Sequence, residues 1–257
     1  MCGRFVTAIE WTEIAELYDA QEATGRLPDA SWNVAPTDTI GIVLDSAKTG
    51  TRRLEPARWG LVPGWADDAS VGARAINARV EDVGSKPTFR KAVIRRRAII
   101  PALGYYEWKR VGPCKQPYFV HGGGLPLAFA GLYEWWRNPQ AAPHAPDRWV
   151  LSATILTMQA AEPMSLLHDR VPVLVSPELS DLWLDPAVAG SPALLGRVSS
   201  RSTEIARELE LHPVSAEVGD VRRNGPHLIE EVELDLASLP GLEVEHPLQP
   251  DEWEAVS

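Results

Sequence analysis

Residues 98–133 read AIIPALGYYEWKRVGPCKQPYFVHGGGLPLAFAGLY, and this stretch decides the fold. Short runs rich in Ile, Val, Tyr, Phe and Trp alternate in it with Pro and Gly, a pattern typical of β-strands joined by tight turns. It predicts strands over residues 98–100, 104–109, 118–120 and 127–133. Successive short strands of this kind are expected to form one mixed, barrel-like sheet.

The sequence on either side adds further strands and a few helices. The predictions are strands over residues 39–44, 55–60 and 149–156, and helices over 9–18, 85–95, 176–184 and 202–209. Pro87 is expected in the first turn of its helix, where a missing N–H is tolerated. The fold class is therefore α+β: a single compact domain over residues 2–231, built on a mixed, barrel-like β-sheet with peripheral helices. An acidic tail, expected to be mobile, follows over residues 232–257.

Composition narrows the class of protein. The 257 residues are 45% hydrophobic and 23% charged, as in a globular protein rather than a disordered one. The sequence has no apolar run of about 18 residues, the length that a membrane-spanning helix needs. Two cysteines, Cys2 and Cys114, exclude a disulfide framework. The first ten residues lack the basic and apolar segments of a secretory signal, so we expect a cytoplasmic protein with no membrane partner.

Charge is distributed unevenly along the chain. The formal net charge is −10, but residues 52–115 hold 14 Lys and Arg against 6 Asp and Glu. Residues 230–257 hold nine acidic residues and no Lys or Arg. Because binding to phosphates depends on the local basic surface, the central block could bind nucleic acid despite the acidic total. The alternative, that these basic side chains are simply solvated, stays open on charge alone.

Cys2 is the most informative residue because of its position. Methionine is normally removed before a small residue, which would make Cys2 the first residue, with a free α-amine beside its thiol. An α-amine has a pKa of about 7.7–8.0, so roughly a tenth of it is unprotonated at pH 7, far more than of a lysine. The amine can attack an aldehyde to give an imine, on which the thiol can close a five-membered thiazolidine ring. The alternative is that Cys2 is an incidental second residue.

Two predicted strands place polar side chains on one face. In an extended run alternate residues share a face, so Asn77 lies beside Arg79, and Glu107 beside Tyr105 and Lys109. Both sets are candidates for a site. The plainer alternatives are turn chemistry for Asn77 and a structural ion pair for Glu107.

Two further segments carry candidate polar groups. His168 and Arg170 share a face if their segment is extended. Residues 32–36 form a loop that contains Asn33 and the rigid Pro36. A hydrogen-bonded core histidine and an asparagine in a turn are the plainer alternatives. No spacing rule by itself joins all these residues into one site.

Six short motifs, taken in order, resemble one known family. They are residues 1–5 (MCGRF), 32–36 (WNVAP), 59–65 (WGLVPGW), 76–81 (INARVE), 106–109 (YEWK) and 168–172 (HDRVP). Together they are similar to the SRAP family, named for SOS response-associated peptidase. The resemblance runs from Cys2 through residues 212–214 (HPV) to about Glu231, so the acidic tail is not part of the family core.

The resemblance implies a function in the DNA damage response: abasic sites in single-stranded DNA are captured as a covalent DNA–protein crosslink. It implies that Cys2 is the nucleophile and that Asn77 holds the ring-opened sugar. It also implies that Glu107 moves protons during imine formation and that His168 is the acid/base of sugar-ring opening. Contacts to DNA are implied for Arg4, Asn33, Pro36, Trp65, Arg79, Lys109 and Arg170. The expected product is a thiazolidine, formed by lyase-like imine chemistry.

Two other functions stay open. An N-terminal cysteine with Glu107 and His168 could serve a peptidase or amidohydrolase that acts on itself or on an amide substrate. A non-covalent single-strand binding module, with Cys2 incidental, would hold DNA without a covalent bond. The first rival would release product, whereas a crosslinker gains the mass of its DNA.

No cofactor is expected. Residues 122–124 (GGG) lie between two predicted strands and indicate a turn rather than a nucleotide-binding loop. A metal site is not expected either, because standard ligand spacing is missing from the candidate ligands Cys2, Cys114, His121 and His168. The expected partner is single-stranded DNA containing abasic sites, bound by a monomer.

Overall fold

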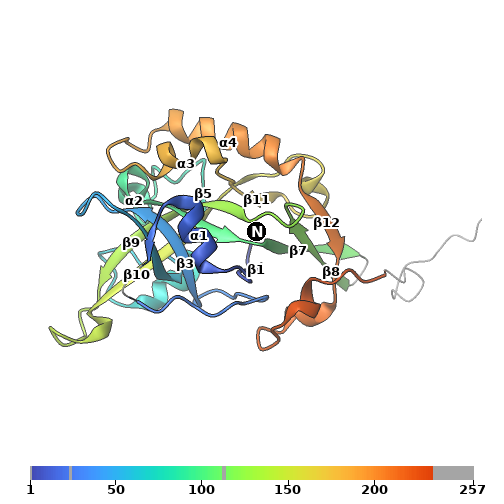
Figure 1. Cartoon of the computed structure of the whole chain (residues 1–257), viewed down its shortest axis with the longest axis horizontal. Helices are drawn as coiled ribbons and strands as arrows, with labels where there is room; N and C mark the ends of the chain where they lie inside the picture. Colours follow the sequence, from blue (N-terminus) through green and yellow to red (C-terminus); the bar gives the residue numbers. More distant parts are fainter. Residues whose placement is uncertain (1, 23–24, 112–113, 234–257) are drawn as a thin grey trace, which may run out of the picture.

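The structure is a computed structural model that describes residues 2–22, 25–111 and 114–233 (Figure 1). From residue 234 on, the predicted tail lies outside the described residues. The strands are β1 (Phe5–Val6), β2 (Gln21–Glu22), β3 (Thr39–Asp45), β4 (Arg52–Trp59), β5 (Asn77–Arg79), β6 (Arg97–Ala102), β7 (Gly104–Val111), β8 (Cys114–His121), β9 (Leu127–Arg137), β10 (Trp149–Gln159), β11 (Arg170–Pro172) and β12 (Glu210–Pro213). The α-helices are α1 (Trp11–Tyr18), α2 (Arg90–Arg95), α3 (Pro177–Leu184) and α4 (Pro192–Ala206). Short 3-10 helices are η1 (Ala69–Arg74), η2 (Pro146–Arg148), η3 (Met164–Leu166), η4 (Ala216–Gly219) and η5 (Pro226–Ile229).

A closed ring of strands forms the centre of the fold. β10 pairs with β9, β9 with β6, β6 with β3 and β3 with β4, all antiparallel. β4 then pairs in parallel with β10, Arg58 opposite Ser152, and closes the ring. Helices α3 and α4 lie together on one side of it (Figure 1). The α+β class and the mixed, barrel-like sheet with peripheral helices are confirmed.

A smaller sheet, in the order β1-β7-β8-β12, carries the start of the chain. Phe5 lies opposite Tyr105 in antiparallel register. The Tyr106 N–H donates to the Arg4 carbonyl at 3.0 Å, which continues this register toward Cys2. The first residues are therefore held against β7, the strand that carries Glu107.

Aromatic side chains in the core tie the small sheet to the barrel. The rings of Phe5 and Trp59 meet edge to face, with centroids 4.8 Å apart. Phe129 of β9 packs in the same way against Phe5 at 5.8 Å and against Tyr105 at 6.0 Å. Such pairs contribute beyond the area that they bury. Since Phe5 is three residues after Cys2, this packing fixes where the start of the chain lies.

Two predicted helices differ from the structure. The helix expected over 85–95 is only α2, because the Asp82 carbonyl accepts from the N–H groups of both Ser85 and Lys86 in a turn. Pro87 lies in this turn, before α2 begins at Arg90, so it is not in the first turn of a helix. The helix expected over 202–209 is α4, which begins at Pro192 and ends at Ala206.

Tertiary packing explains the extra length of α4. Gly196 and several serines give this segment a low helix propensity, so the sequence pattern does not predict its first turns as helix. The Ser191 side chain nevertheless accepts from the Leu194 N–H and caps the helix. Its buried residues, Leu194, Val198, Ser202 and Ala206, recur every four positions and form one face. Within the described residues no helix is long and apolar enough to cross a membrane.

Candidate active site

Cys2 lies at the meeting point of the two sheets and is fully buried. The Nδ2 of Asn77 donates to the Cys2 carbonyl at 2.7 Å. Strand β5 brings Asn77 there because Asn77 pairs with Ile155 of β10 in parallel register. The Asn77 Oδ1 is also buried and has no hydrogen-bond partner among the described residues. The Asn77 side chain therefore binds the Cys2 carbonyl through its Nδ2 and leaves its Oδ1 as an acceptor beside Cys2.

The thiol of Cys2 is poorly solvated and lies near the carboxyl group of Glu107. Burial raises the pKa of this thiol, and the carboxylate of Glu107 raises it further. Burial, Cys2 and Glu107 likewise raise the pKa of Tyr105 well above its ordinary value. The thiol consequently keeps its proton at neutral pH.

Glu107 is 4% exposed on β7, opposite Tyr118 of β8. Burial raises the pKa of its carboxyl because the charged form is poorly solvated there. The positive α-amine at the start of the chain and the backbone of Trp108 lower this pKa part of the way back, and the negative charge of Asp169 adds a smaller increase. A carboxyl in these surroundings can carry a proton closer to neutral pH than an exposed one.

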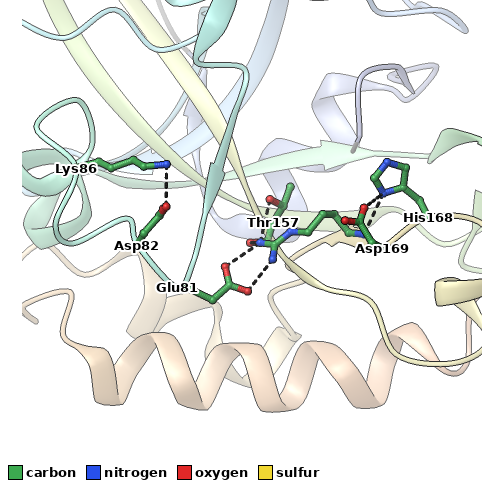
Figure 2. A network of polar contacts seen from close by, with 7 residues as sticks. Glu81, Asp82, Lys86, Thr157, His168 and Asp169 are labelled. Atoms are coloured by element: carbon green, nitrogen blue, oxygen red, sulfur yellow. Dashed lines mark hydrogen bonds and ion pairs between the residues drawn. The ribbon is translucent and has the colours of Figure 1, made fainter.

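His168 lies between η3 and β11, beside Asp169 (Figure 2). Its Nδ1 is 2.6 Å from Asp169 Oδ1, and the Arg170 N–H approaches the same atom at 3.0 Å. Burial lowers the pKa of this imidazole, while Asp169 raises it part of the way back. A neutral imidazole at pH 7 follows, able to accept a proton.

Arg170 links β11, which begins two residues after His168, to the segment that follows the Asn77 strand β5. Its guanidinium binds both carboxylate oxygens of Glu81 at 2.8 Å and donates to the Thr157 carbonyl at 2.6 Å (Figure 2). Thr157 belongs to β10, which lies between β5 and β11 at this point. Glu81 follows β5, so the ion pair reaches across β10. A bidentate pair of this kind fixes geometry as well as charge.

The residues expected to contact DNA lie in different surroundings. Arg4 donates to the Oδ1 of Asn33 at 2.7 Å, and Asn33 is 4% exposed. Arg170 is engaged by Glu81, as described above. Pro36 and Lys109 are half-buried, whereas Trp65 and Arg79 are exposed. Three of the seven side chains are therefore already bound to other parts of the protein.

The family described as SOS response associated peptidase (SRAP) matches residues 1–221. The chain belongs to this family. Abasic site processing protein YoqW of Bacillus subtilis (strain 168) is 36% identical over 236 residues, covering 90% of this chain and 99% of the relative. Abasic site processing protein YedK of Escherichia coli (strain K12) is 30% identical over 237 residues, covering 90% and 100%. A solved structure from Bacteroides thetaiotaomicron has a TM-score of 0.75, covers 90% of this chain and 100% of its own, and at 19% identity shows the fold alone.

In this SRAP member, contacts and charge interactions join the sequence candidates into one group. Asn77 donates a hydrogen bond to Cys2, and the charge of Glu107 raises the pKa of the Cys2 thiol. The charge of Asp169 raises the pKa of both Glu107 and His168. Sequence reasoning assigned no role to Asp169 or to Glu81, although both lie inside the SRAP motifs. Adjacency to His168 is the signal that could have singled out Asp169.

Proposed function

We propose that this protein processes abasic sites in DNA and captures them covalently through Cys2. Membership of the SRAP family supports the proposal, as does its similarity to relatives named abasic site processing proteins. The observation that carries it is the 2.7 Å hydrogen bond from Asn77 to the Cys2 carbonyl, beside the buried Glu107. A second residue that is buried and held by an asparagine side chain beside a buried carboxyl group is difficult to explain as incidental.

The first step forms an imine. After removal of Met1, the Cys2 α-amine attacks the aldehyde of the ring-opened deoxyribose and gives a carbinolamine. Loss of water then gives the imine. The thiol does not compete at this stage, because burial keeps it protonated. The amine is thus expected to react first.

The second step closes the ring. The Cys2 sulfur adds to the imine carbon, the thiol proton leaves, and the imine nitrogen takes up a proton. The product is a thiazolidine, and the whole sequence releases one water. Both nucleophiles belong to one residue, so ring closure has a high effective concentration.

Two side chains are suited to move these protons. The pKa of Glu107 is raised toward neutrality, and that of His168 is lowered, which leaves the imidazole neutral and able to accept a proton at pH 7. Glu107 would donate the proton that lets water leave, and His168 would accept a proton when the sugar ring opens. The acceptor of Asn77 could bind a sugar hydroxyl. Exposed Trp65 and Arg79 would stack on an unpaired base and bind a phosphate.

Denaturing mass spectrometry tests the proposal directly. The protein is measured before and after incubation with a single-stranded oligonucleotide that carries one abasic site. We expect loss of Met1, and then a mass increase of one DNA strand minus water, located at Cys2. A retained Met1, or a processed protein with no adduct, would contradict the mechanism. Turnover of an amide substrate would instead favour the peptidase.

Variants of the two cysteines and of the proton carriers sharpen the test. Cys2→Ala should abolish the adduct, and Cys2→Ser should leave an imine that reverses more easily. Cys114→Ala is the matched control and should react as the wild type does. Glu107→Gln and His168→Ala should slow capture more than they weaken DNA binding, since they remove proton transfer. Wild-type crosslinking in Cys2→Ala, Glu107→Gln and His168→Ala would show that the site is assigned wrongly.

A further inference from the structure

We propose that Asp169 is a positioning residue: its carboxylate competes with the Arg170 N–H for one nitrogen of His168 and so decides which proton that imidazole carries. The inference rests on the proposed function, which assigns proton transfer to His168 and Glu107. The Asp169 side chain is 77% exposed, and no sequence argument gave it a role.

The competition follows from two contacts to the same atom. His168 Nδ1 is 2.6 Å from Asp169 Oδ1 and 3.0 Å from the Arg170 backbone nitrogen (Figure 2). A ring nitrogen either accepts or donates a hydrogen bond, so the two contacts belong to different protonation states. With its proton on Nε2, neutral His168 accepts from the Arg170 N–H. With a proton on Nδ1, it donates to Asp169 instead.

The backbone on both sides of Asp169 is held in place. The Ala160 N–H donates to the Asp169 carbonyl at 2.9 Å. Arg170 lies opposite Gln159 in β11, and its side chain is bound by Glu81 and by the Thr157 carbonyl. The N–H of Arg170 therefore cannot turn away from His168 without breaking this arrangement. The N–H of Arg170 thus stays within reach of Nδ1, and the Asp169 carboxylate approaches the same atom from a fixed backbone.

Asp169 also acts on the second proton carrier. Its charge adds to the rise in the pKa of Glu107 and opposes the fall in the pKa of His168. The other titratable and charged groups that act on the pair are the α-amine at the start of the chain, which lowers both pKa values, and Arg170 of β11, Tyr105 of β7 and Cys2. Because a negative charge favours the protonated form of both carriers, its removal must move both to lower pH.

The variant Asp169→Asn removes the charge with almost no change of shape. The rate of crosslinking to an abasic single-stranded oligonucleotide is measured from about pH 5.5 to about pH 9, a range that covers both carriers. We expect the whole profile to shift to lower pH. Above the wild-type optimum the rate should fall roughly three- to tenfold, since one unit of pKa changes the protonated fraction by up to about tenfold. A uniform loss of rate with no shift would mean a merely structural role and would overturn the proposal.

The matched control is Asp147→Asn, in the exposed turn between β9 and β10, which should leave the profile unchanged. Histidine 15N NMR of the free protein gives a second readout that needs no crosslinking. In Asp169→Asn, His168 should titrate at lower pH and keep its proton on Nε2 over a wider range. An unchanged titration of His168 in this variant would contradict the proposal. If the wild type forms no adduct, the proposed function fails, and this titration still tests Asp169.

Discussion

Asn33 illustrates, at the scale of a residue, how burial changes what a motif asparagine does. Its Oδ1 accepts from Arg4 Nη1 at 2.7 Å. Its Nδ2 donates to the carbonyls of Asp220 at 3.1 Å and Arg223 at 2.8 Å. The side chain therefore ties the loop at 31–35 to the segment at 218–223. Its contact with DNA stays a prediction, while its contacts within the protein are direct.

Asn33→Ala should lower the free energy of unfolding by about 2–3 kcal/mol, because it removes the buried hydrogen bonds to Arg4 and to the carbonyls of Asp220 and Arg223. Urea denaturation measures the loss, and hydrogen exchange should show faster exchange over residues 218–223. The control Asn138→Ala removes a more exposed asparagine and should cost under about 1 kcal/mol. Equal losses of stability in the two variants would show that Asn33 does not hold the loop at 31–35 to the segment at 218–223.

At the scale of elements, two histidines link β8 to β12. His121 Nε2 lies 3.3 Å from His212 Nδ1, the Gly123 N–H donates to His121 Nδ1, and His212 Nε2 lies 2.8 Å from the Ile229 carbonyl. Every donor finds an acceptor only if both rings are neutral, with their protons on Nε2. The pair thus fastens the segment that contains η5 to the small sheet.

This link predicts a pH dependence of stability. Burial, and then His212, lower the pKa of His121 from its ordinary value of 6.5. The unfolded chain therefore binds more protons below about pH 6.5, so stability falls as pH falls through that value. His121→Gln can still donate to His212 but does not titrate. Denaturation at pH 5.5 and pH 7.5 should show a smaller difference for this variant than for the wild type, and an equal difference would contradict the assignment.

At the scale of the whole molecule, folding divides the basic block at 52–115 into two groups. Arg97 is 1% exposed and donates to backbone carbonyls, while Arg52, Arg53 and Arg96 pair with acidic side chains. Their charges are used within the fold. Other basic side chains, such as Arg79, stay exposed. The charge count thus overstates the surface available to phosphates.

Arg79→Ala should weaken binding to single-stranded DNA and lower the slope of log affinity against log salt by about 0.7, the value for one phosphate contact on a single strand. Sequence preference should not change, because phosphate contacts carry no sequence information. Fluorescence anisotropy over a salt series measures both. Arg26→Ala, an exposed arginine outside the block that pairs with Asp29, is the control. An unchanged slope for Arg79→Ala would show that Arg79 makes no contact with a DNA phosphate.

The sequence by itself determined the strands β3, β4 and β6 to β10 and the fold class, and it supplied the candidate site residues that remain predictions. Alternation of apolar and polar residues is local, so β6 to β10 could be predicted from 98–156. The resemblance added the expectation that Cys2, Asn77, Glu107 and His168, each a candidate by itself, belong to one site.

Only the tertiary structure decided the features that depend on distant partners. The pairing of β4 with β10 and the ion pair between Glu81 and Arg170 join residues far apart in the chain. The length of α4 depends on the face that it buries against the rest of the protein. The raised pKa of the Cys2 thiol was equally hidden, since it depends on burial. Sequence pattern reports which face a side chain takes, whereas desolvation and pairing depend on what the fold packs against it.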